Sequence, residues 1–284
     1  MAAARDKYGS RLDAIPALAK FCEQADALVR AGDPATLWDV QPCFQELLTT
    51  DVVEAFVAHE LHAIATRPHH FLIGSSDVHA PLVETAAYSL VVKRLTPDAL
   101  ASGPIVSLTE HTLLAVRAGS VEVERFALAP PFRIDVFDRS ARLVRSPPAT
   151  LGPGMVARFR APGETFRLRL DAPAILIQLL SSIVAPVRWI FHPDTLEPVR
   201  AAAARLSSSR LQFTCRTLAA LGSPSSIPAL QKLTAHPEHY VRWAAIQGIC
   251  AISRDDGIAC LRRATSDEHP HVRRAAERTL LAVG

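Results

Sequence analysis

The sequence has no run of about eighteen apolar residues, the length that a membrane-spanning helix needs. The N-terminus also lacks the continuous apolar block of a secretory signal peptide. Charged side chains interrupt it at Arg5, Asp6, Lys7, Arg11 and Asp13. These two absences predict a cytoplasmic protein without membrane contact.

Paired cysteines are absent too. The chain has five cysteines, an odd number, and no Cys-x-x-Cys motif, which argues against a disulfide framework or a zinc finger. We expect each cysteine to be a small buried apolar residue in a reducing compartment. They are Cys22, Cys43, Cys215, Cys250 and Cys260.

Glycine-rich nucleotide loops and the Gly-x-Ser-x-Gly nucleophile motif do not occur either. What is present is a globular composition: 284 residues, 49% apolar and 21% charged, enough for two domains. The net charge of +3 is unevenly spread, because residues 205–284 hold eleven basic and six acidic residues. The C-terminal part is therefore the basic one.

Two stretches near the C-terminus match under a fixed shift of 31 residues. Residues 241–245, Val-Arg-Trp-Ala-Ala, align with residues 272–276, Val-Arg-Arg-Ala-Ala. From Val241 and from Val272 onward, a stripe of mainly apolar residues recurs at i, i+3, i+4, i+7, i+8 and i+11, the spacing of one helix face. The paired alanines allow two helix backbones to approach closely, so we predict stacked helical hairpins.

This region resembles HEAT repeats of the short kind found in phycobilisome-lyase-type proteins. The resemblance rests on residues 269–276, His-Pro-His-Val-Arg-Arg-Ala-Ala. It implies an α-helical solenoid over residues 193–284 that binds a protein partner or a second copy of the chain. In such stacks the second helix of each pair lines the inner surface. We therefore predict partner contacts at Arg242, Trp243, Gln247, Arg273, Arg274 and Arg278.

Trp243 is the most informative of these residues. A Trp beside an Arg has the composition of an interaction hot spot, but the same Trp could pack against the neighbouring helix instead. The apolar stripe runs to Val283 with no polar capping helix after it. Because solenoids usually cap their ends, we expect the face of Leu280 and Val283 to be covered by a partner or a second copy.

From about residue 69 to residue 191 the apolar period changes to two. Residues 121–124, Val-Glu-Val-Glu, and 166–170, Phe-Arg-Leu-Arg-Leu, alternate as half-buried strands do. Glycine- and proline-rich turns separate such runs at short intervals. This pattern predicts an antiparallel sandwich or jelly roll over residues 68–192.

Three stretches in this region, residues 113–123, 150–154 and 161–166, are similar to the two conserved motifs of cupins. The resemblance implies a jelly roll around a cavity that commonly holds a metal on three histidines and a glutamate. Here those ligand positions fall at Thr112, at Phe166 and within residues 105–108, and none is His or Glu. We therefore expect no metal and no cofactor. A cyclic-nucleotide-binding jelly roll shares residues 151–154 but needs an acidic residue that does not follow them here.

Residues 1–67 read as helices, with breaks at residues 33–34 and 41–42. His59 and His62 lie at i, i+3, whereas zinc peptidases need i, i+4. If a metal is bound after all, we expect its ligands among His69, His70, His79 and His111.

The sequence thus predicts a multidomain α+β chain of N-terminal helices, a cupin-like antiparallel β domain and a C-terminal HEAT-repeat solenoid. The function that fits is a non-catalytic, bacterial-type cytoplasmic scaffold that binds a protein partner. Two alternatives stay open. One is a cupin-type metal-dependent dioxygenase or isomerase with non-standard histidine ligands, and the other is nucleic-acid binding by the basic repeat face.

Overall fold

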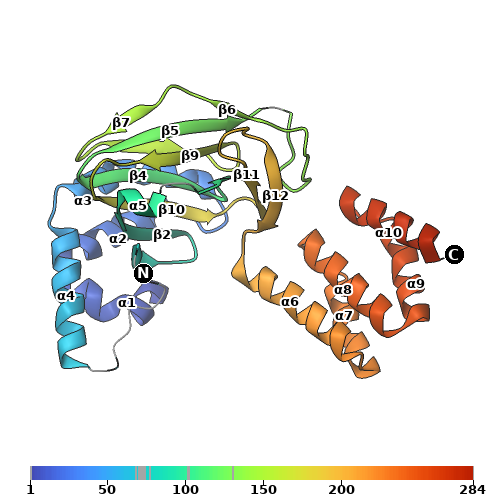
Figure 1. The fold of residues 1–284 in the computed structure, drawn as a ribbon. Helices are drawn as coiled ribbons and strands as arrows, with labels where there is room; N and C mark the ends of the chain where they lie inside the picture. Colours follow the sequence, from blue (N-terminus) through green and yellow to red (C-terminus); the bar gives the residue numbers. More distant parts are fainter. Residues whose placement is uncertain are drawn as a thin grey trace. The chain divides into compact units, whose positions relative to one another are not determined.

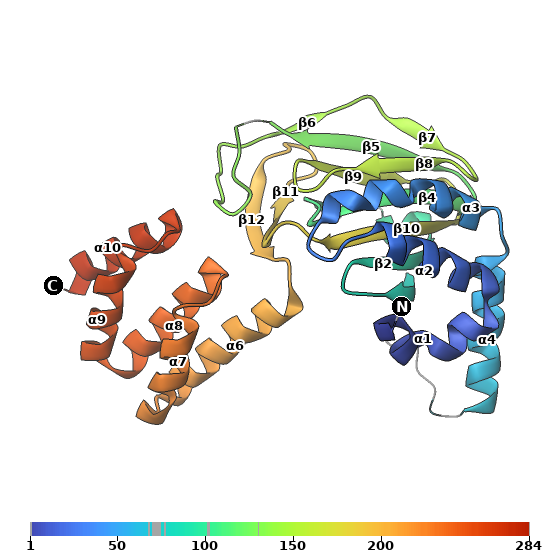
Figure 2. The ribbon, with the colours of Figure 1, turned by 180° about the vertical axis from the view of Figure 1, so that it is seen from behind.

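A computed structural model describes residues 2–67, 69, 75–76, 78–100, 103–129 and 131–283. The chain forms two compact units (Figures 1 and 2). The β unit comprises residues 1–134 and 138–201, and the helical unit comprises residues 135–137 and 202–284. The division into residues 1–67, 68–192 and 193–284 stays a prediction, and the predicted α+β fold class is confirmed.

The β unit begins with helices, as predicted. Proline occupies an early position in α2, η1 and α3, where its missing N–H has no intrahelical partner to lose. The buried faces of these helices form one core with the sheet below them. The elements are α1 (Ala2–Ala14), α2 (Pro16–Leu28), η1 (Pro34–Val40), α3 (Gln41–Leu48) and α4 (Val52–Thr66).

Arg11 ties these helices to the first strand. Its guanidinium donates to the Glu60 carboxylate at 2.7 and 3.1 Å and to the carbonyl oxygens of Pro81 and Leu82 at 2.9 and 2.7 Å. All the partners are buried, so this contact fixes α1 against α4 and the first strand.

Three antiparallel sheets make up the rest of the β unit. The main one has the strand order β1-β2-β10-β4-β8: β1 (His79–Glu84), β2 (Tyr88–Leu95), β10 (Ala174–Ile183), β4 (Glu110–Ala118) and β8 (Val156–Phe159). The second joins β6 (Leu143–Arg145), β5 (Val121–Leu128), β7 (Ala149–Leu151) and β9 (Glu164–Arg169), and the third joins β12 (Pro198–Ala203), β11 (Val187–Phe191) and β3 (Ile105–Val106). The short helix α5 (Pro97–Leu100) follows β2.

The main sheet is buried on both faces, and the alternation of side chains decides which core each residue joins. In β4, Leu113 and Ala115 pack with the N-terminal helices. Leu114 and Val116 pack with residues of the second sheet. We call the face that carries Leu114 the inner face, because it looks toward the second sheet. The predicted β sandwich is therefore confirmed, with a helical layer added on its outer side.

The turn from β4 to β5 requires glycine. Gly119 has φ +82°, and a Cβ there would lie 2.9 Å from the carbonyl oxygen of Pro173, just before β10. Both the left-handed backbone and this close approach exclude a side chain.

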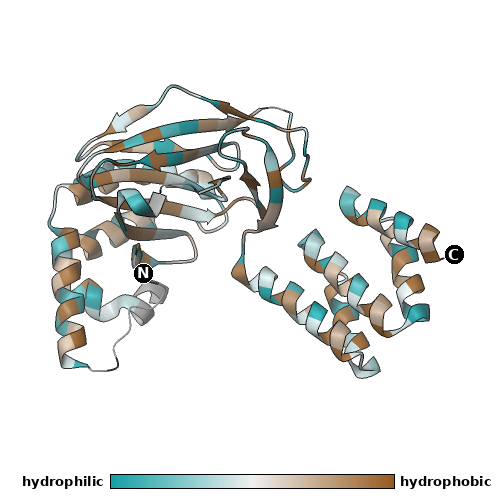
Figure 3. Cartoon of the chain, in the orientation of Figure 1, coloured by the Kyte–Doolittle hydropathy of each residue, from teal (hydrophilic) through white to brown (hydrophobic). Residues whose placement is uncertain are grey.

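The helical unit consists of amphipathic helices around one core, and Figure 3 shows apolar and hydrophilic residues alternating along them. Val241, Ala245 and Ile249 of the predicted stripe are buried. A Cβ on Gly248 would lie 3.3 Å from the carbonyl oxygen of Cys215, so the backbones of two helices do approach closely. The elements are α6 (Leu206–Leu221), η2 (Pro224–Ser226), α7 (Ile227–Leu233), α8 (His239–Ile252), α9 (Arg254–Ala264) and α10 (Pro270–Val283).

Among the described residues, no helix combines the length and the apolar character that crossing a bilayer requires.

Candidate functional site

The repeated Val-Arg pair of the helical unit places an arginine over the turn before its own helix. In α8, Arg242 donates from Nη1 to the carbonyl oxygens of His236 and Pro237, both at 2.9 Å. In α10, Arg273 donates from Nη1 to the carbonyl oxygens of Asp267 and Glu268 at 2.7 and 2.9 Å. The sequence shift of 31 residues thus relates the arginines and also their acceptors.

Arg242 also pairs with two carboxylates, those of Asp267 and Glu268, the latter at 3.2 Å. Its Nε and Nη2 donate to the two carboxylate oxygens of Asp267 at 2.9 and 2.7 Å, which is the bidentate geometry that favours arginine. Asp267 also accepts from the backbone N–H of His269 at 2.8 Å. Burial alone would raise the pKa of Asp267, but the Arg242 guanidinium and this N–H lower it below its ordinary value. The pair links α8 to the segment that leads into α10.

A partner contact at Arg242 would require an exposed side chain, which the structure does not show. Its side chain is buried, because the guanidinium satisfies backbone carbonyls and a carboxylate inside the unit. Arg273 is half-buried for the same reason. Partner binding by Arg242 and Arg273 stays a prediction, but their contacts show that each arginine also stabilises the turn before its own helix.

The other predicted contact residues differ in exposure. Gln247, Arg274 and Arg278 are exposed on α8 and α10. Trp243 is half-buried and packs against the core of the unit, so part of its ring area does serve packing. A partner-binding role for these four residues stays a prediction.

Helix α6 exposes an apolar face that the sequence analysis did not single out. Leu206, Phe213 and Leu221 are 66%, 71% and 71% exposed, and their spacing puts them on one side of the helix. Under the shift of 31 residues, Phe213 corresponds to Ala244, which is buried in the core. The position that is buried in α8 is thus an exposed aromatic ring in α6.

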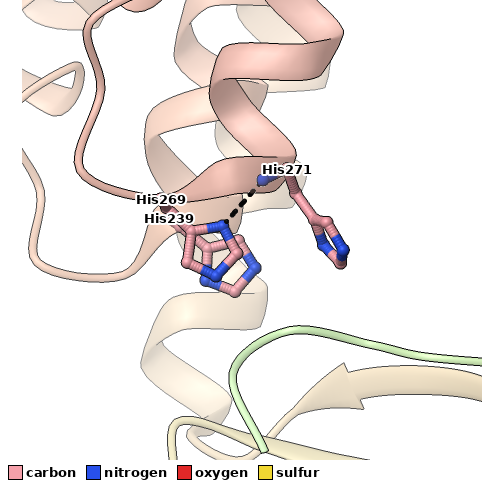
Figure 4. A group of neighbouring side chains, drawn as sticks. All are labelled: His239, His269 and His271. Carbon is pink, nitrogen blue, oxygen red and sulfur yellow. Dashed lines mark hydrogen bonds between the residues drawn. The ribbon is translucent and has the colours of Figure 1, made fainter. Parts of the chain in front are cut away.

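Three histidines of the helical unit form a cluster at the ends of α8 and α10. One ring nitrogen from each of His239, His269 and His271 lies within 4.8 Å of the others. The rings of His239 and His269 stack with centroids 3.6 Å apart and planes at 2°, as Figure 4 shows. The His271 ring stands nearly perpendicular to that of His269 at 75°.

Both nitrogens of His269 are already in use. Its Nδ1 accepts from the backbone N–H of His271 at 3.3 Å (dashed in Figure 4). Its Nε2 lies 3.0 Å from the backbone carbonyl oxygen of Asp135, which belongs to the same unit. Because Nδ1 accepts, the proton must be on Nε2, which donates to that carbonyl.

This geometry does not fit a metal centre as it stands. A ligating nitrogen offers its lone pair in the plane of its ring, so two parallel stacked rings cannot both point at one ion. Binding through His269 would in addition break its contact with His271 or with Asp135. The cluster instead holds residues 135–137 against the ends of α8 and α10.

The surroundings of the three histidines favour the neutral imidazole. Burial, and after it the neighbouring histidines, lower the pKa of His239 to about 4. Burial is also the main cause of the lowered pKa values of His269 and His271. This cluster was not predicted from the sequence. Its visible signals are His-Pro-His at residues 269–271 and His239, which lies beside the equivalent of His271 one repeat earlier.

Within the described part of the chain, the histidines that the sequence singled out do not form one group. His69 is exposed, His79 contacts the Ser76 hydroxyl at 2.9 Å, and His70 lies outside the described residues. His111 lies on the outer face of β4, where its Nδ1 accepts from the backbone N–H of Ala161 and its ring packs against Trp38. Across the described ranges, the only group of three or more possible ligands is the cluster in the helical unit.

Comparison with known proteins supports the repeat. A family model of HEAT repeats matches residues 230–284, which confirms the HEAT resemblance. No curated protein matches the chain.

Similar solved structures include a hydroquinone 1,2-dioxygenase in complex with Cd²⁺ and 4-hydroxybenzonitrile, with 19% identity over 37% of this chain, 63% of that chain and a TM-score of 0.27. A cupin-superfamily sugar phosphate isomerase from Silicibacter pomeroyi is 17% identical over 42% of this chain and 67% of that chain, with a TM-score of 0.26. A hydroquinone 1,2-dioxygenase from Sphingomonas sp. TTNP3 is 12% identical over 40% of this chain and 70% of that chain, with a TM-score of 0.26. This chain thus spans less than two thirds of the first of them, and TM-scores this low carry no argument about function.

Proposed function

We propose that this protein is a non-catalytic interaction protein whose helical unit binds a protein partner. The observation that carries the proposal is the apolar face of α6, where Phe213 and Leu221 are each 71% exposed. Large apolar side chains grouped on one helix face are typical of a surface that another protein covers. HEAT repeats suggest the same role for residues 230–284.

The chemistry of the unit favours a protein over a nucleic acid. The equivalent of Phe213 in α8 is buried between helices, so the natural occupant of the α6 face is another apolar helix. Several arginines of this basic unit are engaged internally, since Arg242 binds Asp267 and Arg273 caps backbone carbonyls. Exposed Arg274 and Arg278 would then form polar contacts with the same partner.

The metal-dependent alternative gains no support from the β unit. Thr112 and Phe166 stand at the positions where the cupin resemblance places a glutamate and a histidine. His111, one residue away from Thr112, lies on the outer face of β4.

Photo-crosslinking in the cells that produce the protein tests the proposal. A photoreactive residue is placed at position 213 on α6 or at position 247 on α8, and a matched control is placed at exposed Ala259 on α9. We expect a defined protein crosslink from position 213, and from 247 if the predicted face takes part, but not from 259. Crosslinks between copies of the chain would identify self-association. Equal crosslinking from all three positions, or none, would refute the proposal.

Substitution gives a second readout. Phe213→Ser should abolish the crosslink at a neighbouring position, because it removes the apolar anchor without touching the core. The matched change Val144→Ser, at a residue of the β unit that is 56% exposed, should leave it intact.

A further inference from the structure

The β unit contains a cavity that the interaction function does not use. Its volume is about 300 Å³, at the lower end of the range for small-molecule sites. Strands β2 and β10 of the main sheet, β9 of the second sheet, and β3 with the segment before it line the cavity. The apolar part of its wall is formed by Leu95, Val106, Phe166 and Leu168.

Two polar side chains of the main sheet face this cavity. Lys93 pairs with Leu176 in the register of β2 and β10, and Gln178 lies two residues farther along β10. Leu176 belongs to the core between the sheets, so Lys93 and Gln178 share the inner face and are diagonal neighbours. Both line the cavity.

Neither polar end is hydrogen-bonded to another residue in the described part of the chain. Gln178 is only 4% exposed, yet its amide has no hydrogen-bond partner among the described residues, and the Lys93 ammonium has no ion-pair partner there. Burial lowers the pKa of Lys93, and the more distant charge of Glu110 opposes this. No atom of Lys93 or Gln178 is among the fully buried unpaired side-chain atoms of the described residues, so both polar ends open into the cavity and are available to a ligand there.

The Glu124 carboxylate, an acceptor beside the cavity-lining Arg167, is already paired with arginines. The Arg167 guanidinium donates to the Glu124 carboxylate at 2.5 Å, and Arg169 contacts the same carboxylate at 3.1 Å. Glu124 is therefore taken up by arginines. Arg167 also lines the cavity, but its guanidinium is paired with Glu124. The polar side chains left to a ligand are therefore one ammonium and one amide, both able to donate, beside an apolar wall.

A metal does not fit this cavity. Phe166, which stands where the cupin resemblance places a histidine ligand, contributes an apolar ring to the wall, and the residues that line the cavity include no His, Cys, Asp or Glu. A cation side chain is found where that resemblance expects a metal.

We propose that this cavity binds a small monocarboxylate with an apolar body, with Lys93 and Gln178 holding the carboxylate and no metal involved. One carboxylate oxygen accepts from the Lys93 ammonium and the other from the Gln178 amide. The single ammonium matches one negative charge. Leu95, Val106, Phe166 and Leu168 contact the apolar body. This site is independent of the partner surface on the helical unit.

Calorimetric titration of the full chain with benzoate, and with its neutral isostere benzamide, tests the proposal. We expect benzoate to bind. The affinity for benzamide should be lower by a factor of roughly ten or more, because a hydrogen bond to a charged group is lost. Excess EDTA should not change benzoate affinity. Equal binding of the two compounds, no binding of benzoate, or loss of binding in EDTA would each overturn the proposal.

Variants assign the residues. Lys93→Met should lower the affinity for benzoate roughly tenfold or more. Gln178→Leu should lower it less, because the donor that it removes is neutral. Lys232→Met, at an exposed lysine of α7, is the matched control and should bind as the wild type does. Thermal unfolding of Lys93→Met should occur at or above the wild-type temperature, since a desolvated charge is removed. Unchanged benzoate affinity in a folded Lys93→Met or Gln178→Leu variant would show that the assigned residue does not hold the carboxylate.

Discussion

Replacing Arg242 with methionine should destabilise the helical unit more than any change on its exposed faces. The side chains of Arg242 and Asp267 are only 6% and 11% exposed. Methionine keeps much of the apolar stem but leaves the Asp267 carboxylate buried without its cation and the carbonyl oxygens of His236 and Pro237 without a donor. Breaking a buried pair in this way costs about 3–5 kcal/mol.

The repeat itself provides the matched control. Arg273→Met removes the equivalent bonds to two backbone carbonyls, but it strands no carboxylate and the site is half-buried. We therefore expect a cost of about 1 kcal/mol. Asp267→Asn keeps an acceptor for the His269 N–H and removes the charge. Combined with Arg242→Met, it should show a coupling free energy of about 1–3 kcal/mol.

Hydrogen–deuterium exchange read by mass spectrometry measures these costs where they arise. Peptides from α8 and α10 should lose protection in Arg242→Met, while peptides from β10 serve as an internal reference and should not change. If Arg242→Met and Arg273→Met lose protection equally, or if the coupling free energy is zero, the ion pair does not stabilise the unit and the reasoning fails.

Three further predictions follow from the other described features. The folded-state pKa of His239, about 4, lies below the ordinary value of about 6.5, so the unfolded chain takes up the proton first as the pH falls. The free energy of unfolding should therefore decrease from about pH 6.5 toward pH 4, and midpoints of urea unfolding should show this decrease. His239→Gln should reduce the slope of stability against pH in that range. Gly119→Ala should lower the free energy of unfolding by about 1–3 kcal/mol, because it places a Cβ at positive φ and 2.9 Å from the carbonyl oxygen of Pro173. Thermal or urea unfolding measures this loss, and an unchanged stability would mean that the turn relaxes. Protein produced without added metal should carry no stoichiometric iron, manganese or zinc by elemental analysis, and a one-to-one content that survives dialysis would redirect attention to the histidines.

The alternation of apolar residues was sufficient to predict both kinds of architecture. A period of two placed strands in the middle of the chain, and a stripe at helical spacing placed α8 and α10. The shift of 31 residues proved more informative than expected, because it relates Arg242 and Arg273 together with the carbonyls that they bind. Local periodicity can be read from sequence, since it depends only on residues close in the chain.

The roles of individual polar residues could not be read in the same way. Arg242 was expected on a binding face, but a carboxylate 25 residues away and the turn before its own helix bury it. His111 was considered as a metal ligand, but the alternation of side chains along β4 places its ring on the outer face, against Trp38. Whether a charged side chain faces solvent depends on partners that the sequence does not reveal.

The sequence by itself determined the order of helices and strands and the helical repeat, because both follow from residue type and short-range spacing. Only the tertiary structure decided which polar groups meet. It stacked His239 on His269, exposed Phe213 where its repeat equivalent is buried, and brought Lys93 and Gln178 to one cavity. The physical reason is that burial and pairing arise from long-range packing: the same side chain is a solvated charge, a structural ion pair or a binding group according to what packs against it.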